Sequence, residues 1–329
     1  MSMRVLVIGG AGFVGRRVVA QLQAAGDFAI TSASRRPRSM PGVQALSLDA
    51  RDSDALRTVL RDHDAVVNCV TGSGPDILAN ARSMAQVLPG SACRRLVHMS
   101  SMAAFGELDG DIDDDAPLGD GGGWYAQAKR DAELQLSALA GPDLGVALLR
   151  PGCVHGPGSH LWVERVGDWL RQRRLGDLGV AGDGWSNLVH VDDVAKAAVR
   201  ALQVALPADA PLRANLVAPD SPRWNDYFTA LAIALGSTPV RRIHPRQLQL
   251  DAYLAAVPLR VWERLAPRLG MGPSLAPPAL PPSLLKLFAQ HRRLRSTNAT
   301  AVLGLQWTSF EDGVADSARW YRSSRQLAP

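Results

Sequence analysis

A tyrosine and a lysine four residues apart, Tyr125 and Lys129, are well suited to proton transfer. Residues four apart share one face of an α-helix, so the phenol and the ammonium can point into one cleft. A phenol has a pKa of about 10, and bringing it to about 7 takes ~4 kcal/mol of differential stabilisation. Nearby positive charge favours the phenolate. The pair is therefore predicted to perform acid–base chemistry, with Tyr125 exchanging the proton.

Two hydroxyl groups, Ser100 and Ser101, follow the apolar run at 95–99. If this run is a parallel strand, its carboxyl end lies at the edge where open sheets bind ligands. We expect Ser101 to donate a hydrogen bond to a substrate carbonyl and Ser100 to hold the local backbone. The alternative for either serine alone is a cap at the end of the strand.

A glycine-rich stretch near the N-terminus, GGAGFVG at 9–15, follows the apolar run at 4–9 and precedes the helical pattern RRVVAQL. In such a loop Gly9 permits a tight turn, Gly12 lets the backbone approach a pyrophosphate, and Gly15 lets the helix pack closely on the strand. The strand before and the helix after it favour a dinucleotide-binding loop over an ordinary strand–helix turn.

The residues about 20 positions further on discriminate between dinucleotides. An acidic residue there binds the ribose hydroxyls of NAD, whereas arginine binds the 2′-phosphate of NADP. The sequence has Arg35 and Arg36 and no carboxylate until Asp49, which favours NADP. NAD stays the alternative, because solvated arginine pairs are common in loops. Asp49 is expected to contact the adenine ring, and a helix cap is its alternative role.

The first half of the chain alternates short apolar runs with helical patterns, which is typical of a parallel sheet covered by helices. We predict an α/β fold with a doubly wound parallel sheet of the Rossmann type in residues 1–150, to which segments at about 187–217 return. The expected strands are 4–9, 28–34, 43–48, 65–70, 95–99 and 146–150, and the expected helices are 12–24, 53–61, 77–88 and 124–139.

The second half changes to Gly/Pro-rich loops between short helices. Residues 151–329 are predicted to form a smaller C-terminal substrate-binding lobe. Seven prolines lie within 258–282, a density that no regular helix tolerates. This segment is interpreted as a lid or flap, with a membrane-surface or dimer contact as the alternatives.

Composition narrows the class of protein. The 329 residues are 47% hydrophobic and 20% charged, enough apolar content for a globular core. The net charge of +5 comes from interspersed residues, and aromatics are only 5%, so no nucleic-acid partner is predicted. Three widely spaced cysteines suggest neither disulfides nor a zinc site, and no metal is expected. With no signal peptide or membrane-spanning stretch apparent, we expect a cytoplasmic enzyme.

Together these motifs resemble the extended short-chain dehydrogenase/reductase superfamily, the NAD(P)-dependent epimerase/dehydratase-like group. Further similar segments are LDARD at 48–52, NCVTG at 68–72, LLRPGCVHGPG at 148–158, NLVHVDDVAKA at 187–197 and the ending LGLQW…SFEDGV…WY. The resemblance implies that Tyr125 is the acid/base, that Lys129 also holds the nicotinamide ribose, that Ser101 is the catalytic hydroxyl, and that the protein is a homodimer. The expected cofactor contacts are Gly9, Gly12, Phe13, Val14, Gly15, Arg35, Arg36, Asp49, Ala50, Val70, Thr71, Gly72, Lys129, Pro151, Cys153 and Val154.

Two departures from the superfamily pattern narrow the expected chemistry. Sugar-nucleotide dehydratases usually carry Asp-Glu after the catalytic Ser/Thr, where this chain has Met102 and Ala103. Sugar-nucleotide epimerases usually present an arginine to the substrate diphosphate where this chain has Ser186. A diphosphate therefore lacks its main cation unless another arginine substitutes. The candidate substitutes are Arg165, Arg171, Arg241 and Arg292.

The sequence thus predicts an NADP-preferring oxidoreductase that interconverts a carbonyl and an alcohol on a largely apolar small molecule by hydride transfer. One alternative is a nucleotide-sugar epimerase with tightly bound NAD, and another is a non-catalytic dinucleotide-binding regulator. The candidate substrate-pocket residues are Ser101, His155, Trp162, Trp185 and Trp262.

Overall fold

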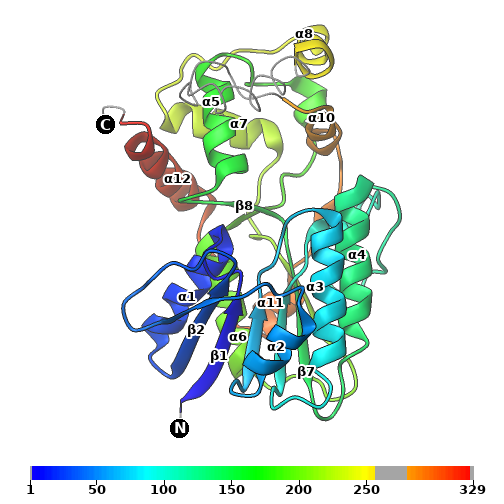
Figure 1. Ribbon diagram of the computed structural model, residues 1–329. Coiled ribbons are helices and arrows are strands. Elements are labelled where there is room, and N and C mark those ends of the chain that lie inside the picture. Colours follow the sequence, from blue (N-terminus) through cyan, green and yellow to red (C-terminus); the bar gives the residue numbers. More distant parts are fainter. Residues whose placement is uncertain (1, 256–279, 327–329) are drawn as a thin grey trace. The chain divides into compact units, whose positions relative to one another are not determined.

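The structure, a computed structural model, describes residues 2–255 and 280–326 (Figure 1). The chain divides into two compact units. The first comprises Met1–Gly152, Val189–Pro219 and Leu294–Trp307, and the second comprises Cys153–Leu188, Asp220–Arg293 and Thr308–Pro329. The return of 294–307 to the first unit differs from the prediction, which places these residues in the C-terminal lobe.

A seven-stranded sheet forms the centre of the first unit, in the order β10-β7-β5-β4-β1-β2-β3. All its strand pairings are parallel. Chain order reverses between β1 and β4, which places the switch point of a doubly wound sheet there and confirms the predicted fold. The strands are β1 (Met3–Ile8), β2 (Phe28–Ser34), β3 (Gln44–Ser47), β4 (Ala65–Asn68), β5 (Arg95–Met99), β7 (Gly145–Pro151) and β10 (Leu212–Leu216).

Helices cover both faces of this sheet (Figure 1). Leu6 and Ile8 pack in one core cluster with Met84 of α3, while Val5 and Val7, which point to the other face, are also fully buried. Burial on both faces explains why the strands are continuous apolar runs. The helices of this unit are α1 (Phe13–Ala25), α2 (Ser53–Leu60), α3 (Gly74–Val87), α4 (Gly123–Ser137), α6 (Val191–Gln203) and α11 (Thr297–Ala301), with the short η1 (Met102–Phe105) and β6 (Asp111–Ile112).

Helix starts in the first unit follow local capping chemistry. Helix α3 begins three residues earlier than expected, because the Ser73 hydroxyl accepts a hydrogen bond from the Asp76 amide and Pro75 occupies the first turn. Asp52 caps α2 in the same way. Helix α1 differs, because its N-cap is Gly12, which has no side chain to cap the first amides. Those amides are left for another partner.

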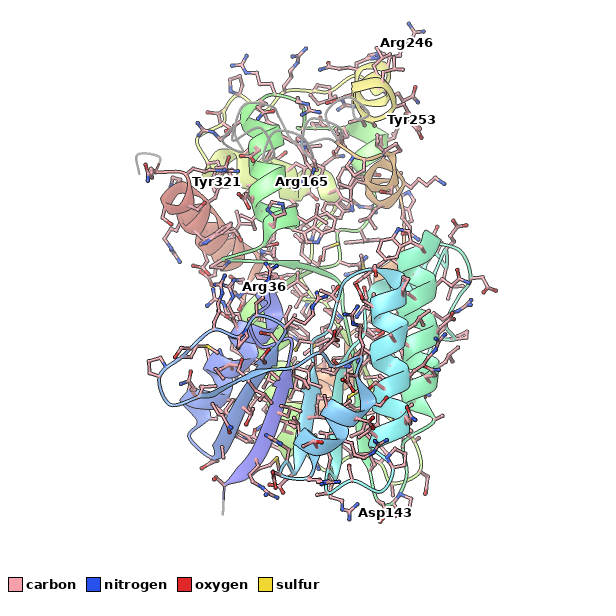
Figure 2. All side chains as sticks on the ribbon, viewed as in Figure 1. Arg36, Asp143, Arg165, Arg246, Tyr253 and Tyr321 are labelled. Atoms are coloured by element: carbon pink, nitrogen blue, oxygen red, sulfur yellow. The ribbon has the colours of Figure 1, made fainter. Side chains whose placement is uncertain are left out.

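The second unit is built from short helices around an aromatic core. The Trp224 ring lies 5.6 Å from the Phe228 ring and 4.9 Å from the Phe288 ring. Tyr321, labelled in Figure 2, donates a hydrogen bond to Asp168 at 2.7 Å. Its elements are β8 (Cys153–His155), η2 (His160–Arg165), α5 (Val166–Arg171), η3 (Gly179–Gly182), α7 (Trp224–Ala234), α8 (Pro245–Leu250), η4 (Asp251–Ala255), α10 (Pro282–Phe288) and α12 (Phe310–Ser324), while β9 (Leu188–His190) and β11 (Arg293–Leu294) lie at the unit boundaries.

Two predictions fall on residues outside the described part of the chain: most of the proline-rich segment, 258–279, and Trp262. Among the helices that the structure does describe, none has the length and apolar character needed to span a membrane.

Candidate active site

The glycine loop at the end of β1 is too tight for side chains. Gly9 has a φ of +78° and its amide donates to the Ala33 carbonyl at 2.8 Å. A Cβ on Gly15 would lie 2.2 Å from the Gly9 carbonyl oxygen, so α1 can approach the loop this closely only with glycine at position 15. The backbones of Gly9 and Gly15 are therefore in close contact at the end of the first strand.

The N-terminus of α1 has the electrostatic character that a pyrophosphate needs. Gly12 provides no side-chain cap, and the first turn of α1 carries no acidic residue. Phe13 and Val14, which begin the helix, are partly exposed. Because free backbone amides and the helix dipole favour an anion, this end of α1 fits the diphosphate of a dinucleotide.

Arg35 and Arg36 follow β2 and are exposed; Figure 2 labels Arg36. Arg51 binds the Asp49 carboxylate at 2.5 Å and also binds Asp76 of α3 at 2.5 Å. The hydrogen bond from Arg51, with a smaller contribution from Arg35, lowers the pKa of Asp49 to about 2. Asp49 is thus a fixed anion. It does not cap α2, since Asp52 does, so the alternative role given to Asp49 is wrong.

Two buried side-chain amides form a hydrogen-bond network at the end of β4. The Asn68 side chain donates to Asn80 of α3 at 2.7 Å, and Asn80 donates to the Ala50 carbonyl at 3.2 Å. Val70 is partly buried beyond this network, and its amide donates to Asn68 at 3.3 Å. Thr71 and Gly72 follow and are exposed. This arrangement fixes the segment expected to line the cofactor ribose.

The phenol of Tyr125, on α4, meets hydroxyl groups from two other segments. Burial raises the pKa of Tyr125, and hydrogen bonding with Ser101 and Thr71 opposes that rise. Ser101 follows β5, and its own hydroxyl also accepts a hydrogen bond from the Ala103 amide at 3.1 Å. The structure therefore brings together the predicted pair Ser101 and Tyr125, and it adds Thr71 to them.

Lys129, one turn further along α4, is 2% exposed. Its ammonium donates to the Met99 carbonyl at 2.8 Å and to the Val70 carbonyl at 3.4 Å. Burial lowers the pKa of Lys129 to about 8. The expected lowering of the Tyr125 pKa is not a property of the polypeptide alone, because burial of the phenol outweighs the groups that favour phenolate.

Sequence reasoning missed two buried charged residues next to this cluster, Glu133 and Arg150. They form an ion pair at 2.5 Å with both side chains 1% exposed. Ser100 donates to Glu133 at 2.5 Å, so this serine fastens the end of β5 to α4. The available signal was spacing, since Tyr125, Lys129 and Glu133 recur every four residues along one helix face.

The predicted pocket residues of the second unit lie in varied surroundings. His155 is buried, contacts Ser317 of α12 at 3.3 Å, and packs under Gly313, so its surroundings favour a packing role. The partly buried Trp162 ring lies 5.0 Å from the Trp224 ring. Of the three predicted cofactor contacts beside the unit boundary, Pro151 ends β7 in the first unit, and Cys153 and Val154 begin the second.

Trp185 is partly buried and lies under two guanidinium groups, those of Arg223 at 4.7 Å and Arg293 at 4.2 Å. Ser186, which replaces the arginine of the epimerase pattern, is fully buried and donates to the Pro222 carbonyl at 2.6 Å. Neither cation was among the substitutes considered from sequence. Trp185 is therefore flanked by two cations, of which Arg223 also lies 3.8 Å from the Asp183 carboxylate, and not by the apolar set expected from the sequence.

Comparison with known proteins places the chain in a family. The pattern of the NAD dependent epimerase/dehydratase family matches residues 5–212. The chain belongs to this family, within the extended short-chain dehydrogenase/reductase superfamily. Membership makes NAD(P) the class of cofactor, and the glycine loop and the uncapped start of α1 fit such a group.

Three known proteins are similar to this chain in sequence or in fold. A 3-diazoavenalumate denitrifying reductase from Streptomyces sp. is 30% identical over 236 residues, covering 61% of this chain and 72% of its own. MoeE5 in complex with UDP-glucose and NAD has a TM-score of 0.69 at 20% identity, covering 98% and 99% of the two chains. Human epimerase family protein SDR39U1 with NADPH has a TM-score of 0.70 at 19% identity, covering 97% and 99%. The two structures show a shared fold.

Proposed function

We propose that the protein is an NADP-preferring reductase that interconverts a carbonyl and an alcohol on a largely apolar small molecule. The observation that carries the proposal is that Ser101 and Thr71 lie near enough to the Tyr125 phenol to lower its pKa, with Lys129 one helical turn from that phenol. When bound, the dinucleotide supplies the hydride for the substrate carbon. A relative that is itself named a reductase is consistent with this direction of reaction.

In this mechanism Tyr125 is the proton donor. Because burial raises its pKa, the phenol is protonated at neutral pH and can donate to the oxygen of a substrate carbonyl. The Ser101 hydroxyl donates a second hydrogen bond to the same oxygen and stabilises the charge that develops there. The oxidative direction would require the phenolate, which the polypeptide disfavours.

Lys129 and the loops after β1 and β2 bind the cofactor, and Lys129 also stabilises negative charge on Tyr125. The buried Lys129 ammonium favours the phenolate left after proton donation and can bind the nicotinamide ribose. Gly9, Gly12 and Gly15 hold the pyrophosphate, and Arg35 with Arg36 bind the 2′-phosphate. The exposure of both arginines and the absence of an acidic residue between them and Asp49 support NADP over NAD.

A second candidate, a nucleotide-sugar epimerase using NAD, is supported by the surroundings of Trp185. An indole ring with Arg223 and Arg293 over it can stack on a nucleobase and bind phosphate oxygens. The similar MoeE5 structure contains UDP-glucose and NAD. Ser186 counts against this candidate, because its buried hydroxyl cannot replace a guanidinium.

The test is turnover by the purified chain. With NADPH and a panel of apolar ketones and aldehydes, we expect cofactor oxidation that falls by about 10²–10⁴-fold in Tyr125→Phe. Tyr253→Phe, which removes the hydroxyl of an exposed tyrosine in the second unit (Figure 2), is the matched control and should keep full activity.

Other outcomes reject the proposal in favour of its rivals. Interconversion of UDP-sugars without net cofactor oxidation identifies the epimerase. Intact NADPH binding with no turnover on either panel supports the non-catalytic regulator. Full reductase activity in Tyr125→Phe removes the tyrosine from the mechanism.

A further inference from the structure

Glu133 is a buried carboxylate on the helix that carries the candidate acid/base. Its two oxygens accept three hydrogen bonds: from Arg150 Nε at 2.9 Å, from Arg150 Nη2 at 2.5 Å and from Ser100 Oγ at 2.5 Å. Two of the three donors belong to the Arg150 guanidinium, whose contact with the carboxylate is a charge-assisted hydrogen bond. The Glu133 carboxylate is thus fixed in place inside the first unit.

The position of this charge is set by a frame of buried hydrogen bonds. Arg150 Nη1 donates to the Asp114 carbonyl at 2.6 Å. The Asp114 carboxyl accepts from the amides of Asn215 at 2.6 Å and Asn298 at 2.8 Å. These residues come from β7, β10, α11 and the loop after β6, so four segments hold Arg150 against Glu133.

Two successive turns of α4 hold consecutive residues at the end of β5. Lys129 donates to the Met99 carbonyl, and one turn later Glu133 accepts from the Ser100 hydroxyl. The next residue is Ser101, which meets Tyr125. The Lys129–Glu133 spacing therefore fixes the register between the helix carrying the phenol and the strand end carrying the serine.

Several titratable groups face Lys129 from the surrounding elements. Burial raises the pKa of the Cys69 thiol to about 12, and burial together with the Lys129 charge lowers the pKa of His98 well below its ordinary value. Both groups are therefore neutral at pH 7. Interactions with Cys69 and, to a smaller extent, with Glu133 oppose the lowering of the Lys129 pKa by burial. Because the Cys69 thiol is neutral at pH 7, we assign the opposing effect at that pH to Glu133.

We propose that Glu133 is a positioning residue for the candidate active site, which keeps the buried Lys129 in its ammonium form and holds the segment that leads into Ser101. The functional part of this inference rests on the proposed function, since it matters to catalysis only if Lys129 serves Tyr125. The electrostatic part concerns Lys129 alone and can be measured without a substrate.

The chain is favourable for that measurement because it has only three lysines, Lys129, Lys196 and Lys286. Titration of the lysine side chains by NMR, with Lys129 assigned from Lys129→Met, should place its midpoint at about 8 in the wild-type protein. In Glu133→Gln we expect the midpoint to move to lower pH by about one pH unit. The matched control is Asp131→Asn, which removes a partly exposed carboxylate on the same helix and should leave the Lys129 midpoint in place.

An unchanged Lys129 midpoint in Glu133→Gln, or an equal shift in Asp131→Asn, overturns the proposal. Because Glu133→Gln leaves Arg150 buried without its counter-charge, it can fail to fold. The double variant Glu133→Gln/Arg150→Met removes both charges, and it should lower the midpoint in the same direction but by less, because loss of the Arg150 cation partly offsets loss of Glu133.

Activity supplies a second readout. The loss of kcat on the alkaline side should move to lower pH in Glu133→Gln by the same amount as the Lys129 midpoint, and it should not move in Asp131→Asn. A shifted midpoint with an unshifted kcat profile overturns the role in catalysis. If the wild-type protein shows no turnover, the proposed function is refuted. The NMR titration still decides whether Glu133 controls the charge of Lys129.

Discussion

Lys129 is buried in a site that disfavours the charged form of its side chain. Burial lowers its pKa from 10.5 to about 8, which corresponds to about 3 kcal/mol of differential free energy between folded and unfolded states. The folded state binds fewer protons than the unfolded state between pH 8 and 10.5. Stability contributed by this group is therefore lowest below pH 8 and rises as pH increases toward 10.5.

Lys129→Met should consequently stabilise the protein while it removes activity. At pH 7 we expect a gain of about 1–2 kcal/mol in the free energy of unfolding, because the lost hydrogen bonds to two carbonyls offset part of the desolvation gain. The gain should shrink at pH 10, where the wild-type lysine is largely neutral. Denaturant unfolding at both pH values measures it. Lys286→Met, at an exposed position, is the control and should show no such pH dependence, and a gain that does not shrink contradicts the argument.

Individual residues differed in how far the sequence could predict them. Tyr125, Lys129 and Ser101 were proposed from the sequence because hydroxyl and ammonium groups stand at the start of a predicted helix and the end of a predicted strand. Glu133 was not, because a glutamate within a helix is ordinarily solvated, and its partner Arg150 is 17 positions away. The pairing of Trp185 with Arg223 and Arg293 depends on long-range folding for the same reason.

At the scale of elements, the close contact between α1 and the end of β1 is the most constrained feature of the cofactor loop. In Gly15→Ala the added carbon would meet backbone atoms of Gly9 and Gly10 at 2.2–2.9 Å, which side-chain rotation cannot relieve. We expect destabilisation of about 1–3 kcal/mol and NADPH affinity reduced by at least tenfold, measured by calorimetry. Gly141→Ala, where the added carbon meets nothing within 4 Å, should leave both properties unchanged. Wild-type affinity in Gly15→Ala would disprove the role of this contact.

Most elements of the first unit were predictable because the central strands are buried on both faces and helices such as α2 and α3 begin at capping residues. Expected strand 28–34 coincides with β2, and 95–99 coincides with β5. The second unit has few such regularities. Its core depends on aromatic contacts between segments far apart in sequence, such as Trp162 with Trp224 and Trp224 with Phe288, and periodicity does not report those contacts.

At the scale of the whole molecule, a cofactor that binds only the folded chain raises its stability by mass action, by about 2.7 kcal/mol at a concentration 100 times Kd. If Arg35 and Arg36 bind the 2′-phosphate, NADPH should raise the Tm more than NADH at equal concentration. Arg35→Ala/Arg36→Ala should remove that difference while the response to NADH persists, because the rest of the loop is intact.

The matched control is Arg61→Ala/Arg94→Ala. It removes two exposed arginines that precede β4 and β5, at the amino-terminal ends of the strands of the same sheet. It changes the net charge equally, so it separates a specific phosphate contact from general attraction of an anion. General attraction predicts equal weakening of NADPH binding in both double variants. A specific site predicts loss in the first alone, and equal loss of NADH and NADPH responses in that variant would reject the assignment of Arg35 and Arg36 to the phosphate.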